Sequence, residues 1–283
     1  MDLQEVASLV LWTRITTYVN FASGTIVALD WLLTFDWEVS FIWKSDWSVM
    51  KVLYLLARYL PFVDVTLVLY HHFAHNPTNY HCQRLFTAQA FFFVAGATLV
   101  ELIFTLRTWA VWKQDKRLMP ALVLIFCATW TGVFMVGIFY LKKISHRSSP
   151  VPTQLGCFMV STTPILFIGY VLLMLYDAFL LTLMLIRGIY MYRLGGRGSR
   201  LVVVVFGDGI IYFFYIFVIS FINIVANIKL PDILHPLLMI VARVLHAVLA
   251  CRVILHIREQ AASQQNGGLG DDLTLPVTDP SGY

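Results

Sequence analysis

Charged residues are scarce in this sequence. Asp, Glu, Lys and Arg make up 13% of its 283 residues, whereas soluble domains carry roughly a quarter. Hydrophobic residues reach 59%, and the mean hydropathy is +0.76. One soluble core cannot bury that much apolar surface, so the composition predicts an integral membrane protein. The net charge of +4 is then a matter of membrane topology, and we expect no nucleic-acid partner.

Motifs of common enzymes are absent as well. The glycine-rich stretch "RLGGRGSR" at 193–200 lacks the strand–loop–helix context of a phosphate-binding loop. His71 and His75 are four residues apart, a spacing that suits a shared metal ion on a helix, but catalytic zinc needs a third ligand and an activating acid. We therefore expect no enzymatic activity, no cofactor and no metal site. A zinc-dependent intramembrane hydrolase, with His71 and His75 as ligands, is the remote alternative.

Long apolar runs are what the sequence has instead. A helix needs about 20 mainly apolar residues to cross a bilayer, and continuous runs favour helices over the alternating strands of a β-barrel. The sequence predicts an all-α integral membrane fold, a bundle of seven transmembrane helices within residues 1–258. The polar, aromatic-poor segment 259–283 is expected to be a disordered cytoplasmic tail. The predicted spans are roughly 15–35, 48–70, 85–112, 118–141, 162–187, 201–228 and 232–256.

The distribution of Lys and Arg predicts the orientation of this bundle. One side holds six of these residues and the other twelve, and basic residues favour the cytoplasmic side. We expect the N-terminus outside and the C-terminus in the cytoplasm, in the plasma membrane or another membrane of the secretory pathway. The first inner loop differs from the other inner loops because it is acidic, with Asp36, Glu38 and Asp46. This composition favours a role for the loop other than setting the membrane orientation.

Cysteines are few, and two of the four lie on the side predicted to be external. Cys82 precedes the third span and Cys157 precedes the fifth. Because an oxidising compartment allows disulfides to persist, we predict a Cys82–Cys157 bridge. Two free thiols on the same side are the alternative.

Seven helices with an external N-terminus and such a bridge resemble G-protein-coupled receptors in layout, although topology does not set function. The third span ends in "ELIFTLRTWAVW", with no acidic residue before Arg107. The seventh has no Asn-Pro-x-x-Tyr and no lysine, which argues against a retinal Schiff base.

A second resemblance rests on longer motifs. The stretch "LDWLLTFDWEVSFIWKSDWSVMKVLYLLARYLPFVD" at 29–64, "LRTWAVW" after the third span, "DGIIYF" in the sixth and "RVLHAVLACRVILHIRE" at the end are similar to a family of fungal, mainly basidiomycete, membrane proteins of unknown function. The similarity extends to about Glu259. It implies the seven-helix fold and supplies no activity.

Ionisable residues inside the predicted spans are costly in lipid and usually mark a switch or an ion path. Buried structural bridges that fix helix packing are the alternative. We predict an inward-facing polar network of these residues. Its members are Asp30, Arg58, Asp64, Glu101, Asp177, Asp208, Arg243 and His246.

The spacing of these charges predicts some of the pairs. Arg58 and Asp64 are six residues apart, about 240° around a helix, so we expect them to have separate partners, with Pro61 affecting the angle between them. Arg58 and Arg243 are expected near mid-span, each pairing with Asp30, Glu101 or Asp208.

These features favour a receptor-like sensor that responds to a small or lipidic ligand by helix rearrangement. The lipid bilayer is its expected partner. Arg107, Arg193, Arg197 and Arg200, on the inner side, suit anionic lipid or a cytosolic signalling partner, with simple topogenic charge as the alternative. A transporter or ion-translocating protein that uses the buried acids is the second hypothesis. The oligomeric state stays open.

Overall fold

The computed structural model describes residues 3–73, 78–143, 146–148, 157–159, 165–194, 200–229 and 237–271. Helices dominate this part of the chain. The elements are α1 (Leu3–Glu38), the π-helix η1 (Val39–Trp43), α2 (Val49–Phe73), α3 (Asn79–Val111), α4 (Leu118–Lys143), β1 (His146–Ser148), β2 (Cys157–Met159), α5 (Leu166–Leu194), α6 (Arg200–Lys229) and α7 (Leu237–Asp271).

Seven helices of the described chain are long and apolar enough to cross a bilayer. Large apolar side chains such as Leu32, Phe91 and Leu124 are 65–71% exposed on the outside of the bundle. A soluble protein rarely leaves so much apolar surface uncovered, whereas lipid would cover it. The seven long apolar helices are as the sequence predicts, and together with this exposed apolar surface they fit a multi-pass membrane protein.

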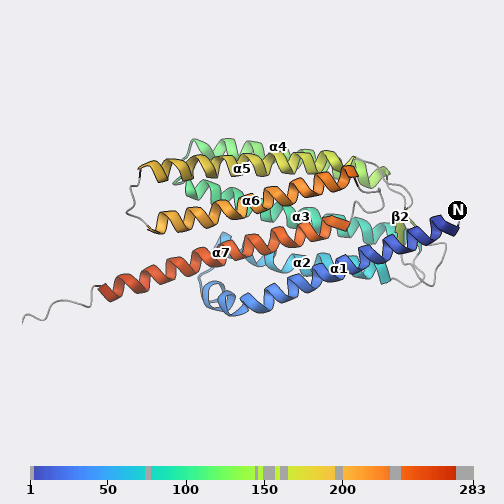
Figure 1. The fold of residues 1–283 in the computed structure, drawn as a ribbon, viewed down its shortest axis with the longest axis horizontal. Coiled ribbons are helices and arrows are strands. Elements are labelled where there is room, and N and C mark those ends of the chain that lie inside the picture. Colours follow the sequence, from blue (N-terminus) through green and yellow to red (C-terminus); the bar gives the residue numbers. More distant parts are fainter. Residues whose placement is uncertain are drawn as a thin grey trace, which may run out of the picture.

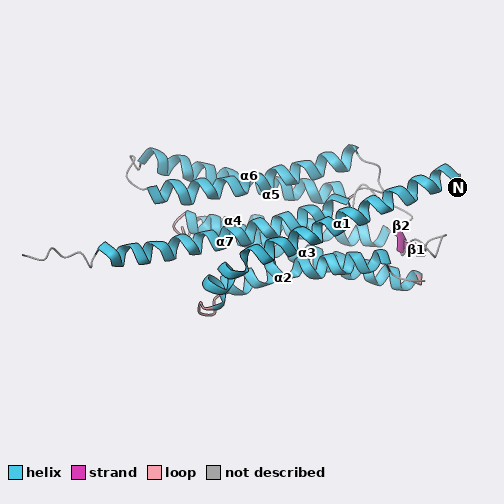
Figure 2. Ribbon diagram, turned by 60° about the horizontal axis from the view of Figure 1, so that its bottom comes forward, coloured by secondary structure: helices cyan, strands magenta, loops and turns pink. Residues whose placement is uncertain are grey.

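A short sheet modifies the all-α prediction. β1 and β2 pair antiparallel, with Arg147 opposite Phe158, and both strands pack against α3. Figure 2 shows them beside the first turns of α1. We call this end of the bundle the strand end and the opposite end, where α7 finishes, the tail end. Strands of three residues are too short to leave an alternating pattern that a sequence could reveal.

The last helix is longer than the sequence predicted. Residues 259–271 were expected to begin a disordered tail, but α7 continues to Asp271. Glu, Gln and Ala in this segment are good helix formers, and the next proline is Pro276. Residues 272–283 lie outside the described chain.

Helix α7 is the centre of the bundle. It packs against α1, α2, α3 and α6, and it passes between the α1–α2 pair and α6 in Figure 1. Within their spanning windows, 56% of α7 is buried but only 11% of α4. A displacement of α7 would therefore disturb contacts with four other helices.

The end of α1 is a turn of π-helix, η1. Such wide turns are rare and often occur at functional sites. Ile42 within η1 is fully buried in the main core. Because α1 runs directly into η1, the chain stays helical to Trp43 and the predicted inner loop is shortened to the few residues before α2.

Candidate functional site

Arg58 of α2 is the centre of a buried ionic network near the tail end. Its Nη1 donates to Asp30 Oδ2 at 2.6 Å and its Nε to Glu38 Oε2 at 3.3 Å. Its Nη2 donates to Thr34 Oγ1 and to the carbonyls of Asp30 and Trp31. All three nitrogens of the guanidinium thus have partners on α1, as a buried charge requires. Asp30 is one of the three acids predicted for Arg58.

Asp30 joins a second guanidinium to the network. Arg252 of α7 donates from Nε to Asp30 Oδ1 at 2.6 Å. The two carboxylates of Asp30 and Glu38 therefore face the two guanidiniums of Arg58 and Arg252. Opposite charges are equal in number, and the cluster links α1, α2 and α7.

Glu38 is a member of this network that the sequence analysis placed in the first inner loop. Its side chain is fully buried, and besides Arg58 it accepts hydrogen bonds from the Tyr59 hydroxyl at 2.9 Å and Trp43 Nε1 at 3.1 Å. The acidic composition of the predicted loop indicated that its carboxylates have a role, but not that Glu38 is buried. The helical continuation through η1, which places Glu38 inside the bundle, left no signal in the hydropathy.

Two basic residues hold η1 from the tail end. Lys51 Nζ donates to the carbonyls of Trp43 at 3.1 Å and Ser45 at 2.6 Å. Arg258 of α7 donates to the carbonyl of Phe41 at 2.6 Å and to Ser45 Oγ at 2.9 Å. These contacts satisfy carbonyls that a helix end leaves without partners. Lys51, Arg252 and Arg258 are three of the twelve basic residues counted on the predicted inner side, and the structure gives each of them a specific contact.

A second ion pair lies closer to the strand end. Arg243 Nε of α7 is 3.2 Å from Asp64 Oδ2 of α2, and both side chains are 1% exposed. Among the described residues, Nη1 and Nη2 of this arginine have no hydrogen-bond partner. They lie against the backbone of α3, where a Cβ on Gly96 would come within 1.8 Å of Nη2.

The prediction for Arg243 was wrong in its partner, since Asp64 takes the place of Asp30, Glu101 or Asp208. The predicted span 232–256 placed Arg243 at mid-membrane, but α7 begins at Leu237 and runs to Asp271. Arg243 is therefore near the start of its helix, level with the later turns of α2 that carry Asp64. Arg58 and Asp64 do have separate partners, and α2 runs through Pro61.

Glu101 of α3 meets an acid instead of a guanidinium. It hydrogen-bonds to Asp177 of α5, and Ser220 Oγ of α6 donates to Asp177 Oδ2 at 2.5 Å. A hydrogen bond between two carboxyl groups needs a proton, so this pair carries at most one negative charge. One turn further along α3, Thr105 Oγ1 is 2.6 Å from the Tyr176 hydroxyl.

The remaining predicted network residues do not join these clusters. His246 is half-buried and hydrogen-bonds to the backbone of Ile216 in α6. The Asp208 side chain lies outside the described part of the structure.

The arginines predicted at the inner side are only partly described. The Arg107 guanidinium lies 5.9 Å from the Phe213 ring centre, and Arg193 is exposed at the end of α5. Arg197 and the Arg200 side chain lie outside the described residues.

The predicted histidine pair and cysteine pair each have one member that lies outside the described residues or side chains. His71 is buried with its ring 6.4 Å from that of Phe86, and His75 is outside the described chain. No group of three or more metal-binding side chains occurs among the residues that the structure describes.

Cys82 is fully buried in the first turns of α3, against which the strand starting at Cys157 packs. Because the Cys157 side chain is not among those described, the bridge stays a prediction.

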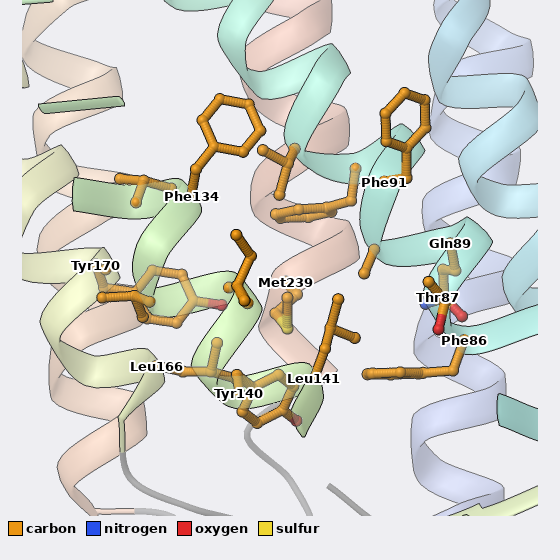
Figure 3. A pocket seen from close by; sticks show the side chains of 18 of the residues that line it. Phe86, Thr87, Gln89, Phe91, Phe134, Tyr140, Leu141, Leu166, Tyr170 and Met239 are labelled. Atoms are coloured by element: carbon orange, nitrogen blue, oxygen red, sulfur yellow. The ribbon is translucent and has the colours of Figure 1, made fainter. Parts of the chain in front are cut away.

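An apolar cavity of about 300 Å³ lies at the strand end between α3, α4, α5 and α7. Its size is at the lower limit for small-molecule sites, roughly 300–1,000 Å³. Among its lining residues none is charged. The side chains that line it include Phe86, Phe91, Phe134, Tyr170 and Met239 (Figure 3).

Helix α7 connects this cavity to the ion pairs. Met239 and Ile240 form part of the cavity wall, and Ile240 also packs in a core cluster with Val65, the neighbour of Asp64. Further along α7 come Arg243 and then Arg252 with their acidic partners. The void beside Arg58 and Asp30 is only about 10 Å³, at most the size of one water. In the described part of the chain, the two ion-pair clusters bring opposite charges together, and the cavity of about 300 Å³ is lined by uncharged, mainly apolar side chains.

One family model matches a part of the chain. A model described as "Family of unknown function (DUF6533)" matches residues 18–63. The match covers all but the last residue of the motif 29–64 on which the resemblance was based. It includes Asp30, Glu38 and Arg58, the α1 and α2 part of the network. No curated protein matches the chain.

Proposed function

We propose that the protein is a receptor-like sensor that works by conformational change and not by covalent chemistry. A small lipid-soluble ligand would occupy the cavity, and α7 would carry the resulting displacement to the tail end. The observation that carries this proposal is the series of contacts along α7. The helix contributes Ile240 to the cavity, Arg243 to the second ion pair, and Arg252 and Arg258 to α1 and η1.

The geometry of a helix supports this transmission. Ile240 and Arg258 are separated by about 27 Å along the axis, at 1.5 Å per residue. Buried ion pairs are made or broken as units, so they provide discrete alternative arrangements and not gradual deformation. A ligand that prefers one arrangement would shift the population towards it by its difference in affinity.

The proposed orientation places the cavity in the outer half of the membrane and the ionic network in the inner half. It rests on the excess of Lys and Arg at the tail end, in the plasma membrane or another membrane of the secretory pathway. A Cys82–Cys157 bridge would then hold β2 against α3 on the outside. The exposed Arg193 and the arginines after α5 would face anionic lipid or a cytosolic signalling partner.

A pair of spin labels can test this proposal without a known ligand. Asp46 and Ala262 are accessible positions on the α1–α2 loop and on α7, and both would be changed to cysteine in a Cys127→Ala background. Gly137 of α4 lines the cavity, and a Cβ there meets nothing within 4 Å, so Gly137→Leu would fill the space much as a ligand does.

We expect Gly137→Leu to change the distance distribution between the two labels, measured by electron–electron resonance in lipid nanodiscs. Gly137→Ala, which fills little of the cavity, is the matched control and should leave the distribution unchanged. Identical distributions in all three proteins would contradict the proposal, because the cavity would then be uncoupled from the tail end.

A second candidate function, ion translocation, is favoured by the Glu101–Asp177 pair. Two carboxyl groups that share one proton at the junction of α3, α5 and α6 are suited to binding and releasing that proton. Proton flux in reconstituted vesicles tests this function directly. Flux in the wild type that is lost in Glu101→Gln would favour translocation over the sensor, and its absence in both proteins would leave the pair a structural contact.

A further inference from the structure

The Tyr170 hydroxyl is the feature that indicates which ligand the cavity would take. Tyr170 lies on α5, and Figure 3 shows its ring directed into the cavity. The hydroxyl oxygen is buried and has no hydrogen-bond partner among the described residues. Buried hydroxyl groups normally have a partner, so an oxygen-bearing ligand would supply what the surrounding side chains do not.

The rest of the lining limits the chemistry of that ligand further. None of the residues that line the cavity is charged, so a carboxylate, phosphate or ammonium group would be buried there without a counter-charge. Thr87 already donates its hydroxyl to the Gln83 carbonyl. Gln89 and Tyr140 are the other polar side chains of the lining. A neutral molecule with a hydrogen-bonding oxygen and a mainly apolar body fits these conditions.

The route into the cavity points to the same class. Phe91 on α3 and Phe134 and Ile138 on α4 line the cavity and are 46–66% exposed on the surface of the bundle. That part of the surface is within the apolar spans. The cavity therefore opens towards the lipid between α3 and α4, and a ligand that partitions into the bilayer would enter from there.

We propose that the cavity is the binding site of a small, neutral, lipid-soluble alcohol, whose oxygen hydrogen-bonds to the Tyr170 hydroxyl. That binding of this alcohol is sensed by the protein rests on the proposed function, whereas binding in the cavity can be tested separately. The competing occupant is an acyl chain of a bilayer lipid, which would fill the same space without using the hydroxyl of Tyr170.

Photolabelling in nanodiscs would distinguish these occupants. The probes are a ten-carbon primary alcohol with a diazirine in its chain and the matching diazirine-bearing alkane. Labelled peptides would be mapped by mass spectrometry in the wild type, Tyr170→Phe, Gly137→Leu and Gly137→Ala. Tyr170→Phe keeps the ring and removes only the hydroxyl, and thermal melting would establish that each variant is folded.

We expect the alcohol to label the cavity segments 133–141 and 166–173 more strongly than the alkane does. Tyr170→Phe should reduce labelling by the alcohol about five- to tenfold, the effect of one hydrogen bond, and leave labelling by the alkane unchanged. Gly137→Leu should abolish labelling of these segments by both probes, while Gly137→Ala should have little effect.

Equal labelling by the two probes that does not respond to Tyr170→Phe would overturn the inference and indicate an acyl chain. Labelling that survives Gly137→Leu would show that the probes bind outside the cavity, which overturns it as well. If labelling depends on Tyr170 but the distance between the labels at Asp46 and Ala262 does not respond to Gly137→Leu, the binding site stands and the sensor proposal fails.

Discussion

Replacing Arg58 with methionine should strongly destabilise the protein, and the contacts of Arg58 give the magnitude. The substitution leaves Asp30 with the guanidinium of Arg252. Glu38, which is fully buried, keeps only the neutral donors of Tyr59 and Trp43. One buried carboxylate is thus left without a counter-charge, which costs about 3–5 kcal/mol.

The unfolding free energy in lipid bicelles, measured by steric trapping, is the suitable assay. Arg58→Met should lower it by about 3–5 kcal/mol, and Glu38→Gln in the same chain should restore about half of the loss by removing the stranded charge. Arg252→Met should cost only about 1 kcal/mol, because Arg252 is half-exposed and Asp30 keeps Arg58. Arg193→Met, at an exposed position, is the matched control and should have no measurable effect.

Two results would refute this reasoning. The first is an Arg58→Met protein as stable as the wild type, which would mean that the cluster contributes nothing to the fold. The second is a double variant that is no more stable than Arg58→Met, since Glu38 would then not be the residue left without a counter-charge.

Three further predictions concern other parts of the molecule. Gly96→Ala should lower the melting temperature, because the new methyl group would displace the buried guanidinium of Arg243. Gly137→Ala should raise it slightly, because alanine has the better helix propensity. Equal melting temperatures for the two variants would contradict the close approach at Gly96. Because Cys82 is buried, alkylation must be done on the denatured protein; mass spectrometry should then find Cys82 and Cys157 modified only after reduction, and modification of both before reduction would exclude the bridge. A cysteine at Asp46 should react with an impermeant maleimide only when the cytoplasmic face is open to the reagent, and reaction at the outer face of intact cells would reverse the predicted orientation.

The sequence predicted the helices well because each spanning helix carries its own signal. A run of about 20 apolar residues indicates a span without reference to the rest of the chain. The ends were less predictable, as α7 shows, because helices continue beyond the apolar run wherever good helix formers follow. β1 and β2 have three residues each, too few to leave a local alternating pattern.

The partners within the candidate site were only partly predictable for a related reason. Buried charges are conspicuous in an apolar sequence, so Arg58, Asp64 and Arg243 were evident as site residues. Their pairing depends on relative depth, and the predicted span 232–256 placed Arg243 closer to mid-helix than α7 (Leu237–Asp271) does, and so away from Asp64. Glu38 was missed because its burial depends on the π-turn of η1, which hydropathy does not indicate.

The distance between labels at Asp46 and Ala262 tests the central claim most directly, namely that α7 couples the cavity to the ionic network. The account predicts that Gly137→Leu shifts this distance and that Gly137→Ala does not. It also predicts that Arg58→Met replaces the single distance by a broad distribution, because the ion pairs with Asp30 and Glu38 are lost. A single distribution shared by the wild type and all three variants would contradict the account.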